Sequence, residues 1–557
     1  MPSNYGPLSQ SNQRVNVDHF SMVPRADIPR STFTTQHTHK TTFDGGYLVP
    51  IFVGEALPGD SFSANMTVFA RMNTLLFPLM DHITLETFGF FVPNRLLWLN
   101  WKRFMGEQDT PGASISYLIP QVTGPAGGWK IASLGDYFGL PTVGQCTPGV
   151  AIATNALPLR AYQLIYNEWF RDENLVPPAT FNYFSDGPDS ANDYGMRRRA
   201  KRHDYFTSAL PWPLKDNSAV NIPLSGTAPV KGLGLVGFPV PTGPYASVAE
   251  SGVYPGTVTY TGGTLTNTAS VVVRQSAIHN GYPDVYADLT QASGATIAAL
   301  RLAVQTQRFL ERDARSGTRY TELLRAHFGV MPEDARLQRP EYIGGGRSAV
   351  QTSAIPQTSA TGVSGGSSPL AALGGASTIT GQHTFRYNAA EHGYIIILAH
   401  VDAELTYQQG LHRMWSRNTR FDFYFPVFAH LSEQAILNKE IYVDGTSADD
   451  QIFGYQERWA EYRHYPSRIS GLFRSTGSGT MPDTTPVIPI DAWHSAQRFG
   501  AIPTLNSTFI ESAPPFGRNL AAGALASGQQ FLCDMLFTVS HTRAMPMYSV
   551  PGNMDRF

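Results

Sequence analysis

A dense run of positive charge at residues 196–206 is the stretch of this sequence best suited to binding a charged partner. It reads Met-Arg-Arg-Arg-Ala-Lys-Arg-His-Asp-Tyr-Phe, and its cations are Arg197, Arg198, Arg199, Lys201 and Arg202. Such cations neutralise phosphates, and the nearby rings of Tyr205, Phe206 and Trp212 suit base stacking, so one interpretation is contact with nucleic acid. The other is that the arginines pair with carboxylates or carbonyls where protein chains meet, because arginine is enriched at interfaces.

Two glycine motifs have the spacing of known functional loops, but neither has the context that its chemistry requires. Gly232-Leu-Gly-Leu-Val-Gly237 matches a dinucleotide loop, which must lead into a helix whose N–H groups meet the pyrophosphate. Phe238-Pro-Val-Pro241 follows instead, and two prolines in four residues exclude an ordinary helix. Gly362-Val-Ser-Gly-Gly366 matches a nucleophile elbow at Ser364, but it lies in a Ser/Gly-rich stretch rather than at a strand-to-helix turn. Chance explains both matches better.

Candidate metal ligands are equally sparse. His37 and His39 lie close together, but no second pair of ligands follows at the spacing of a metal site. An exposed polar strand is therefore the preferred interpretation of this pair. The sequence also contains no His-Glu-x-x-His, Walker loop or Cys-x-x-Cys pair. We predict a protein that is not an enzyme and that has no cofactor and no metal site.

The composition favours a large protein with many turns and a surface that partners cover. The chain has 557 residues, of which 42% are hydrophobic and 12% aromatic, with 51 Gly and 40 Pro. Charged residues make up 15%, against roughly a quarter in an average globular protein. The net charge of −2 excludes a global basic field for nucleic acid. Cys146 and Cys533 are the only cysteines, so a reducing compartment is expected, and the polar N-terminus shows no signal segment.

The residue patterns then predict the elements that position these groups. Strands are expected at 41–50, 62–70 and 82–92, where apolar and polar residues alternate or aromatic runs end at proline, and a short aromatic helix or turn at 94–107. Apolar residues at helical spacing predict helices at 159–174, 295–312 and 319–328. Further strands are expected at 393–407, 421–428 and 531–539, and residues 344–381 are expected to form an irregular loop. A hairpin is expected from 257–260 and 269–274, around Gly262-Gly263.

Several strings, all in the same order, carry a family resemblance. They are Arg30–Phe33, Thr42–Pro50, Leu57–Asp60, Phe90–Arg95, Phe104–Glu107, Leu157–Asp172, Arg336–Gly345 and Gly454–Arg463. Over most of its length the chain resembles the major capsid proteins of gokushoviruses, which are small single-stranded DNA phages of the Microviridae. One departure is Gly54 before Glu55, where the family pattern has an acidic residue, so the chain lacks a paired carboxylate at that point.

The resemblance implies a mainly β fold, namely an antiparallel eight-stranded viral jelly roll with long inserted loops and a few helices. It divides the chain into an N-terminal arm at 1–40, a first part of the core with a helical insert at 41–214, a surface insertion at 215–294 and a second part of the core at 295–557. The insertion is expected to form protrusions at the threefold axes. Apolar residues there would bury one another and contact the host: Val236, Phe238, Val240 and Tyr245.

The resemblance also implies the function and the partners. Many copies are expected to form a T=1 icosahedral shell around circular single-stranded DNA, assembled in the cytoplasm of the host bacterium. The implied partners are further copies of the chain, the DNA, a small basic DNA-binding protein, a pilot protein, an internal scaffolding protein and a cell-surface receptor. Two alternatives remain, namely a carbohydrate-binding or cupin-like jelly roll with a compact pocket, and an intracellular hydrolase that uses Ser364.

Overall fold

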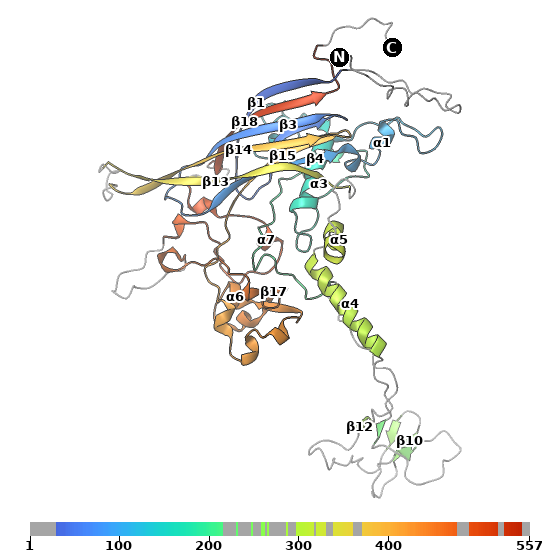
Figure 1. Cartoon of the computed structure of the whole chain (residues 1–557), viewed down its shortest axis with the longest axis vertical. Coiled ribbons are helices and arrows are strands. Elements are labelled where there is room, and N and C mark those ends of the chain that lie inside the picture. Colours follow the sequence, from blue (N-terminus) through green and yellow to red (C-terminus); the bar gives the residue numbers. More distant parts are fainter. Residues whose placement is uncertain are drawn as a thin grey trace, which may run out of the picture. The chain divides into compact units, whose positions relative to one another are not determined.

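The computed structural model describes most of the chain, and Figure 1 shows the arrangement of its elements. By its contacts the chain forms two compact units, one of Met1–Pro211 with Thr318–Phe557, and one of Trp212–Gly317. The residues described are 29–215, 230–231, 247–248, 258–261, 264–266, 286–287, 297–316, 319–329, 338–359, 370–475, 490–521 and 528–548.

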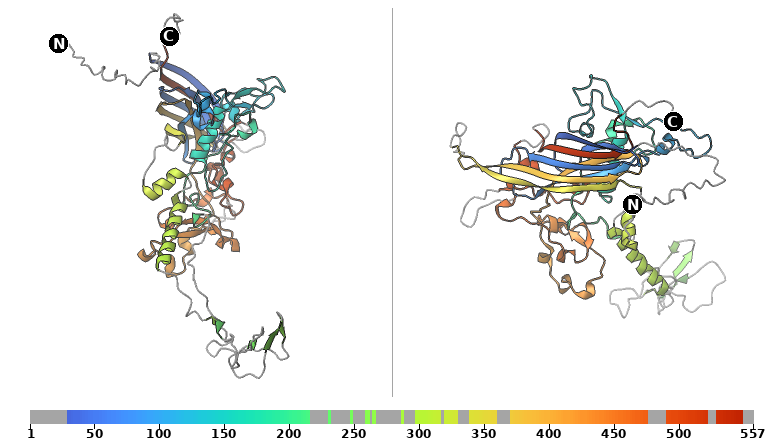
Figure 2. Two further views of the ribbon diagram at one scale, coloured as in Figure 1. Left: turned by 90° about the vertical axis from the view of Figure 1, so that its right-hand side faces the viewer. Right: turned by 45° about the horizontal axis from the view of Figure 1, so that its top comes forward.

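The first unit is built on one eight-stranded sheet, which confirms the predicted mainly β jelly roll. All neighbouring strands pair antiparallel, in the order β1-β18-β3-β14-β13-β4-β15-β2. Figure 2 shows these strands from two further directions. Their bounds are β1 Ser31–Phe43, β2 Val49–Ala56, β3 Ser61–Met72, β4 Ile83–Pro93, β13 Glu341–Pro356, β14 Leu373–Asn388, β15 Gly393–Ala403 and β18 Phe531–Arg543.

The sheet curls around an apolar core, so its two end strands approach each other. Every second residue of β3, from Phe62 to Met72, is buried in this core, as the alternation in the sequence predicted. The ring of His37 in β1 stacks on Phe52 of β2, with centroids 5.9 Å apart, and His39 Nδ1 lies 2.9 Å from Ile51 O. These contacts join the opposite ends of the strand order and leave the barrel nearly closed.

Strands β4 and β15 are covered on both faces. Every residue of β15 is buried, and in β4 only Glu86 and Phe88 are partly exposed. Phe90 and Ile396 point away from the barrel core into a second apolar cluster, which includes residues of α3 (Leu157–Ile165). A strand buried on both faces has no polar alternation, which explains the uninterrupted apolar run in β15.

The smaller elements lie in the long connections between the core strands. Helix α3 continues into a π-helical turn at Tyr166–Phe170, and α5 ends at the left-handed Gly329, as predicted. The other elements of the first unit are α1 Trp101–Phe104, β5 Gln121–Thr123, α2 Leu134–Tyr137, β6 Ala153–Asn155, β7 Asp189–Ser190, α5 Tyr320–Phe328, β16 Glu433–Leu437, α6 Asn438–Ile441, β17 Ile452–Glu457 and α7 Ser507–Ile510.

The second unit contains the predicted insertion together with a long helix. Strands β10 and β11 pair antiparallel, with Thr261 opposite Thr264. The expected second strand at 269–274 lies outside the described residues. The described elements of this unit are β8 Val230–Lys231, β9 Ser247–Val248, β10 Val258–Thr261, β11 Thr264–Thr266, β12 Tyr286–Ala287 and α4 Ile297–Ser316.

Three predictions of local structure were wrong. Residues 31–40, assigned to an N-terminal arm, form most of β1 and pair with β18. Much of the predicted loop at 344–381 belongs to β13 and β14, which pair with each other from Val350 onward. Residues 421–428 form no strand, because they have no pairing partner; two short 3-10 turns, Arg420–Asp422 and Pro426–Phe428, occupy this stretch.

Candidate functional site

The backbone of the basic run at residues 197–202 is fixed on both sides. Leu48 N donates to Arg197 O at 2.9 Å, and Arg199 N donates to Gly46 O at 3.2 Å. On the other side Lys201 N donates to Ile510 O at 2.7 Å. The run is therefore a connecting segment held between the loop after β1 and helix α7.

The arginines of the run bind groups of their own chain. Arg199 and Arg202 both pair with Glu86 of β4, and Arg202 also donates to Thr84 Oγ1 at 2.7 Å. Arg198 donates to Ser512 O at 2.9 Å and lies 4.1 Å from the centre of the Tyr47 ring. Arg197 Nε donates to Gln163 Oε1 at 3.2 Å. Each guanidinium is thus held in place, and each arginine is only partly buried.

Lys201 occupies a different environment from the arginines. Its side chain is buried, its Nζ donates to Phe509 O, and the ammonium lies 4.6 Å from the centre of the Phe509 ring. Burial lowers the pKa of Lys201 to about 8, against the opposing effect of Asp402 and Asp204. Lys201 therefore contributes to the connection with α7.

The structure separates the cations from two of the three rings that were expected to act with them. Tyr205 and Phe206 are buried in a small core with Tyr407 and Phe453, so they do not present faces for base stacking. The pairing with carboxylates and carbonyls that the sequence allowed is present, but within one chain. Contact of the exposed arginine surfaces with DNA or with a neighbouring subunit stays a prediction.

Beside the run lies a cleft of about 260 Å³ with both signs of charge on its walls. Arg202, His203 and His464 line it together with Asp204 and Glu404. Asp402 lines it as well, so three carboxylates face one arginine, and a mainly acidic wall does not favour a phosphate. Among the described residues, no three histidine, cysteine or acidic side chains are grouped so that they could hold a metal ion.

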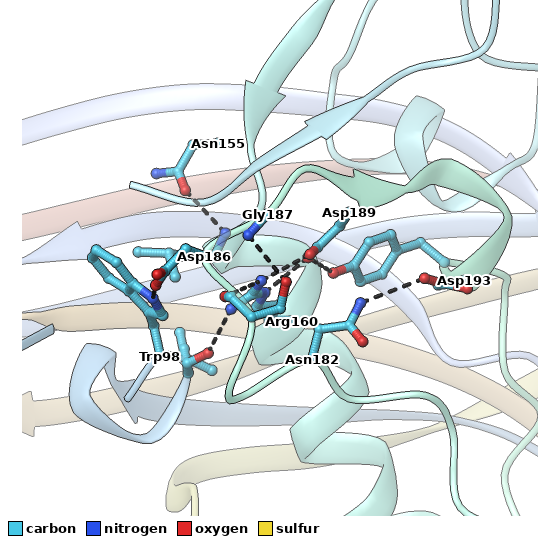
Figure 3. A network of polar contacts seen from close by, with 12 residues as sticks. Trp98, Asn155, Arg160, Asn182, Asp186, Gly187, Asp189 and Asp193 are labelled. Carbon is cyan, nitrogen blue, oxygen red and sulfur yellow. Dashed lines mark hydrogen bonds and ion pairs between the residues drawn. The ribbon is translucent and has the colours of Figure 1, made fainter. Parts of the chain in front are cut away.

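A buried polar network holds together the first long insertion, which follows β4 at residues 94–211 (Figure 3). Arg160 of α3 forms a two-bond ion pair with Asp189, through Nε and Nη2 at 2.8 Å each, and neither side chain is exposed. Arg160 also donates to Leu97 O at 3.2 Å and Ser185 O at 3.0 Å, and Tyr194 donates to Asp189. Trp98 Nε1 donates to Asp186 Oδ1 at 2.7 Å. The network is fully paired, which is the arrangement of a structural site.

The remaining sequence candidates divide into two groups. His37 and His39 lie on the mostly exposed strand β1, as the preferred interpretation predicted. The glycine motifs at 232–237 and 362–366, with Ser364, lie outside the described residues, and so do the four apolar residues proposed for the protrusion: Val236, Phe238, Val240 and Tyr245.

Sequence reasoning missed an exposed group of aromatic side chains in the connection between β15 and β18. Its members are Trp415, Phe421, Phe423, Tyr424, Phe425 and Tyr462, which we call the aromatic surface. The density of rings and arginines at 413–428 is a visible signal, of which the sequence prediction used only the stretch 421–428, as a strand.

Comparison with known proteins shows the family of this chain. Residues 21–553 match the model of the family described as "Capsid protein (F protein)". The chain is 42% identical to the capsid protein VP1 of Bdellovibrio phage phiMH2K, over 98% of this chain and 99% of that protein. It is 41% identical to capsid protein VP1 of Chlamydia phage 1, over 97% and 98%, and 34% identical to that of Spiroplasma virus 4, over 98% and 99%.

Within the part of the chain that the structure describes, no helix combines the length and apolar character needed to cross a membrane. The match extends over nearly the whole chain and agrees with the jelly roll that the structure shows. The resemblance to gokushovirus major capsid proteins is thereby confirmed, and this chain belongs to the phage capsid protein (F protein) family.

Proposed function

We propose that copies of this chain close into a small T=1 icosahedral shell that encloses a circular single-stranded DNA genome. The single observation that carries this proposal is the match to phage capsid proteins over almost the entire chain. The rigid barrel supplies the wall of the shell, and the long connections between its strands supply surfaces for contact. In a closed shell each subunit is held by several neighbours, so individually weak contacts give a stable particle.

The net charge of the chain limits how much of the phosphate charge of the genome it can neutralise. A net charge of −2 leaves little to neutralise phosphates, so most of the neutralisation falls to other cations, including a small basic DNA-binding protein packaged with the genome. Arg197, Arg198, Arg199 and Arg202 keep partly exposed surfaces and are the candidates for local contact with the DNA or with a subunit seam. An internal scaffolding protein and a pilot protein complete the set of assembly partners, in the cytoplasm of the host bacterium.

The insertion at 215–294 is the proposed site of host attachment. Its charges are few, and glycine and proline punctuate it throughout, which suits an excursion at the surface. Three copies that meet at a threefold axis would bury Val236, Phe238, Val240 and Tyr245 against one another, and the protrusion would contact a cell-surface receptor. A structural protein needs no catalytic site. We therefore expect that Ser364→Ala abolishes no enzymatic activity, whereas loss of a defined hydrolytic activity in this variant would favour the hydrolase alternative.

Gradient sedimentation tests the shell directly. The protein, produced with its phage partners, is expected to sediment as megadalton particles that protect single-stranded DNA from nuclease. A carbohydrate-binding protein or a hydrolase would sediment as a small species, and that result would overturn the proposal. If intact particles formed but did not protect DNA from nuclease, only the proposal that the shell encloses the genome would be overturned.

A further inference from the structure

We propose that the aromatic surface is a contact between two copies of this chain in the assembled shell. The inference rests on the proposed function and adds the position and chemistry of one interface. The six side chains that define the surface are exposed as follows: Trp415 69%, Phe421 58%, Phe423 50%, Tyr424 46%, Phe425 48% and Tyr462 41%. No part of the chain that the structure describes covers these rings completely.

Most of these rings are linked to one another by ring contacts or through Arg417. Arg417 joins two segments, since its guanidinium carbon lies 4.3 Å from the centre of the Tyr462 ring and 5.5 Å from that of Phe423. The Tyr424 and Tyr462 rings are 6.3 Å apart, and Phe421 and Phe425 both contact Phe428. Trp415 precedes Arg417 by two residues, in the 3-10 turn Arg413–Ser416. Ring contacts therefore join Phe423, Tyr424 and Tyr462 into one group and Phe421, Phe425 and Phe428 into another, and both groups belong to neighbouring stretches of the chain.

The size of this surface matches an interface rather than a solvent face. A fully exposed aromatic side chain offers about 150–250 Å², so the six exposed fractions correspond to roughly 500–800 Å². The largest apolar patch of a typical monomer is about 300–600 Å², whereas one side of a standard protein interface buries about 800 Å². Val427, which is 87% exposed, extends the surface further.

The surface is held rigidly before any partner arrives. Arg417 pairs with the buried Glu461 at 3.2 Å, and Arg413 pairs with the buried Glu440 at 3.0 Å. Asp422 accepts hydrogen bonds from Thr419 N at 2.7 Å and Asn418 N at 3.0 Å. A preorganised surface loses little conformational entropy on binding, which favours a specific contact.

The charges favour a protein partner over a nucleic acid. Residues 411–475 contain equal numbers of basic and acidic residues, and arginines at the aromatic surface are paired with Glu440 and Glu461. Binding to single-stranded DNA needs unpaired cations along the backbone path as well as rings. Exposed aromatic residues with paired arginines are instead the composition of a protein interface. In a shell made of many copies of one chain, the partner is a second copy.

Two experiments test the inference in the complete phage system. In the first, W415S/F423S is compared with F184S, which removes a ring that is 80% exposed but lies outside the aromatic surface. Loss of two aromatic contacts at about 2 kcal/mol each predicts at least a tenfold fall in the particle fraction. The F184S particles are expected at the level of the unchanged protein, and circular dichroism checks that unassembled W415S/F423S is folded.

In the second, a photoreactive phenylalanine replaces Trp415. Irradiated particles are expected to yield cross-linked dimers of this chain, and unassembled protein is expected to yield none. Cross-links to DNA or to another phage protein, or a W415S/F423S particle fraction equal to that of F184S, would overturn the inference while the shell itself stands. If the unchanged protein forms no particles, the proposed function falls, and the inference falls with it. Should W415S/F423S fail to fold, the cross-link alone decides.

Discussion

Arg160 and Asp189 meet through two hydrogen bonds of 2.8 Å and are both fully buried, so an ion pair lies at the centre of the first long insertion. Loss of one partner leaves the other charge without compensation in an apolar site. Arg160→Met is therefore expected to destabilise the folded chain by about 3–5 kcal/mol, measured by urea unfolding of unassembled protein.

The matched control for this substitution is Arg103→Met, in the same insertion. Arg103 pairs with Asp109 at the surface, where ion pairs contribute little, so no clear change in the unfolding midpoint is expected. Equal losses of stability in the two variants would show that burial of the Arg160–Asp189 pair does not matter.

The second prediction concerns pH. His383 of β14 is buried in the barrel between Thr87 Oγ1 at 2.6 Å and Ser348 Oγ at 3.0 Å, and burial lowers its pKa. Below about pH 6.5 the unfolded chain binds a proton at this residue that the folded chain does not bind. The free energy of unfolding should therefore fall as the pH is lowered through this range, measured by urea unfolding between pH 7.5 and 5.5.

His383→Asn isolates this contribution, because asparagine is polar and does not titrate. Burial also lowers the pKa of His39 and His541, so part of the pH dependence should persist in the variant. A slope of stability against pH that is the same in the variant as in the unchanged protein would assign the effect to other groups.

The third prediction concerns the basic run. Arg199→Gln with Arg202→Gln removes both main partners of Glu86, whose side chain is only 14% exposed. A loss of about 1–3 kcal/mol is expected for each charged hydrogen bond, together with a lower particle yield. Lys130→Gln, at an exposed cation elsewhere, is the control. Unchanged particle yield and unchanged DNA content per particle would remove this run from both proposed roles.

The fourth prediction concerns the insertion. Replacement of residues 226–287 by a short Gly/Ser linker is expected to leave particles intact but unable to attach to cells, since the proposed receptor contact is lost. Particle yield by sedimentation and attachment by cell-binding assay are measured side by side. Failure to form any shell would show instead that the insertion serves assembly.

The sequence predicted elements whose signal is local. In β3 and β18 the alternation of apolar and polar residues reports one buried face and one exposed face, and both strands were found. The jelly roll itself came from the family resemblance, because pairing between Ser31–Phe43 and Phe531–Arg543 joins the two ends of the chain and leaves no local mark.

Prediction from the sequence failed where tertiary contacts override the local preference for a strand or a loop. Gly344, Gly345 and Gly346 look like a loop, yet they belong to β13, where a Cβ on Gly346 would lie 2.2 Å from the ring of His383. The glycines are there because the strands and side chains approach closely. Phe421–Phe428 has the composition of a strand, but it finds no partner strand and exposes its rings instead. Glu86, the partner of Arg199 and Arg202, is more than 100 residues away from them in the sequence.

A three-dimensional reconstruction of the purified particle by cryo-electron microscopy tests the central claim most directly. We predict a closed T=1 shell with one copy of this chain in each icosahedral asymmetric unit and the eight-stranded barrel in its wall. Particles built mainly of another protein, or an open or unsymmetrical assembly of this chain, would contradict the account.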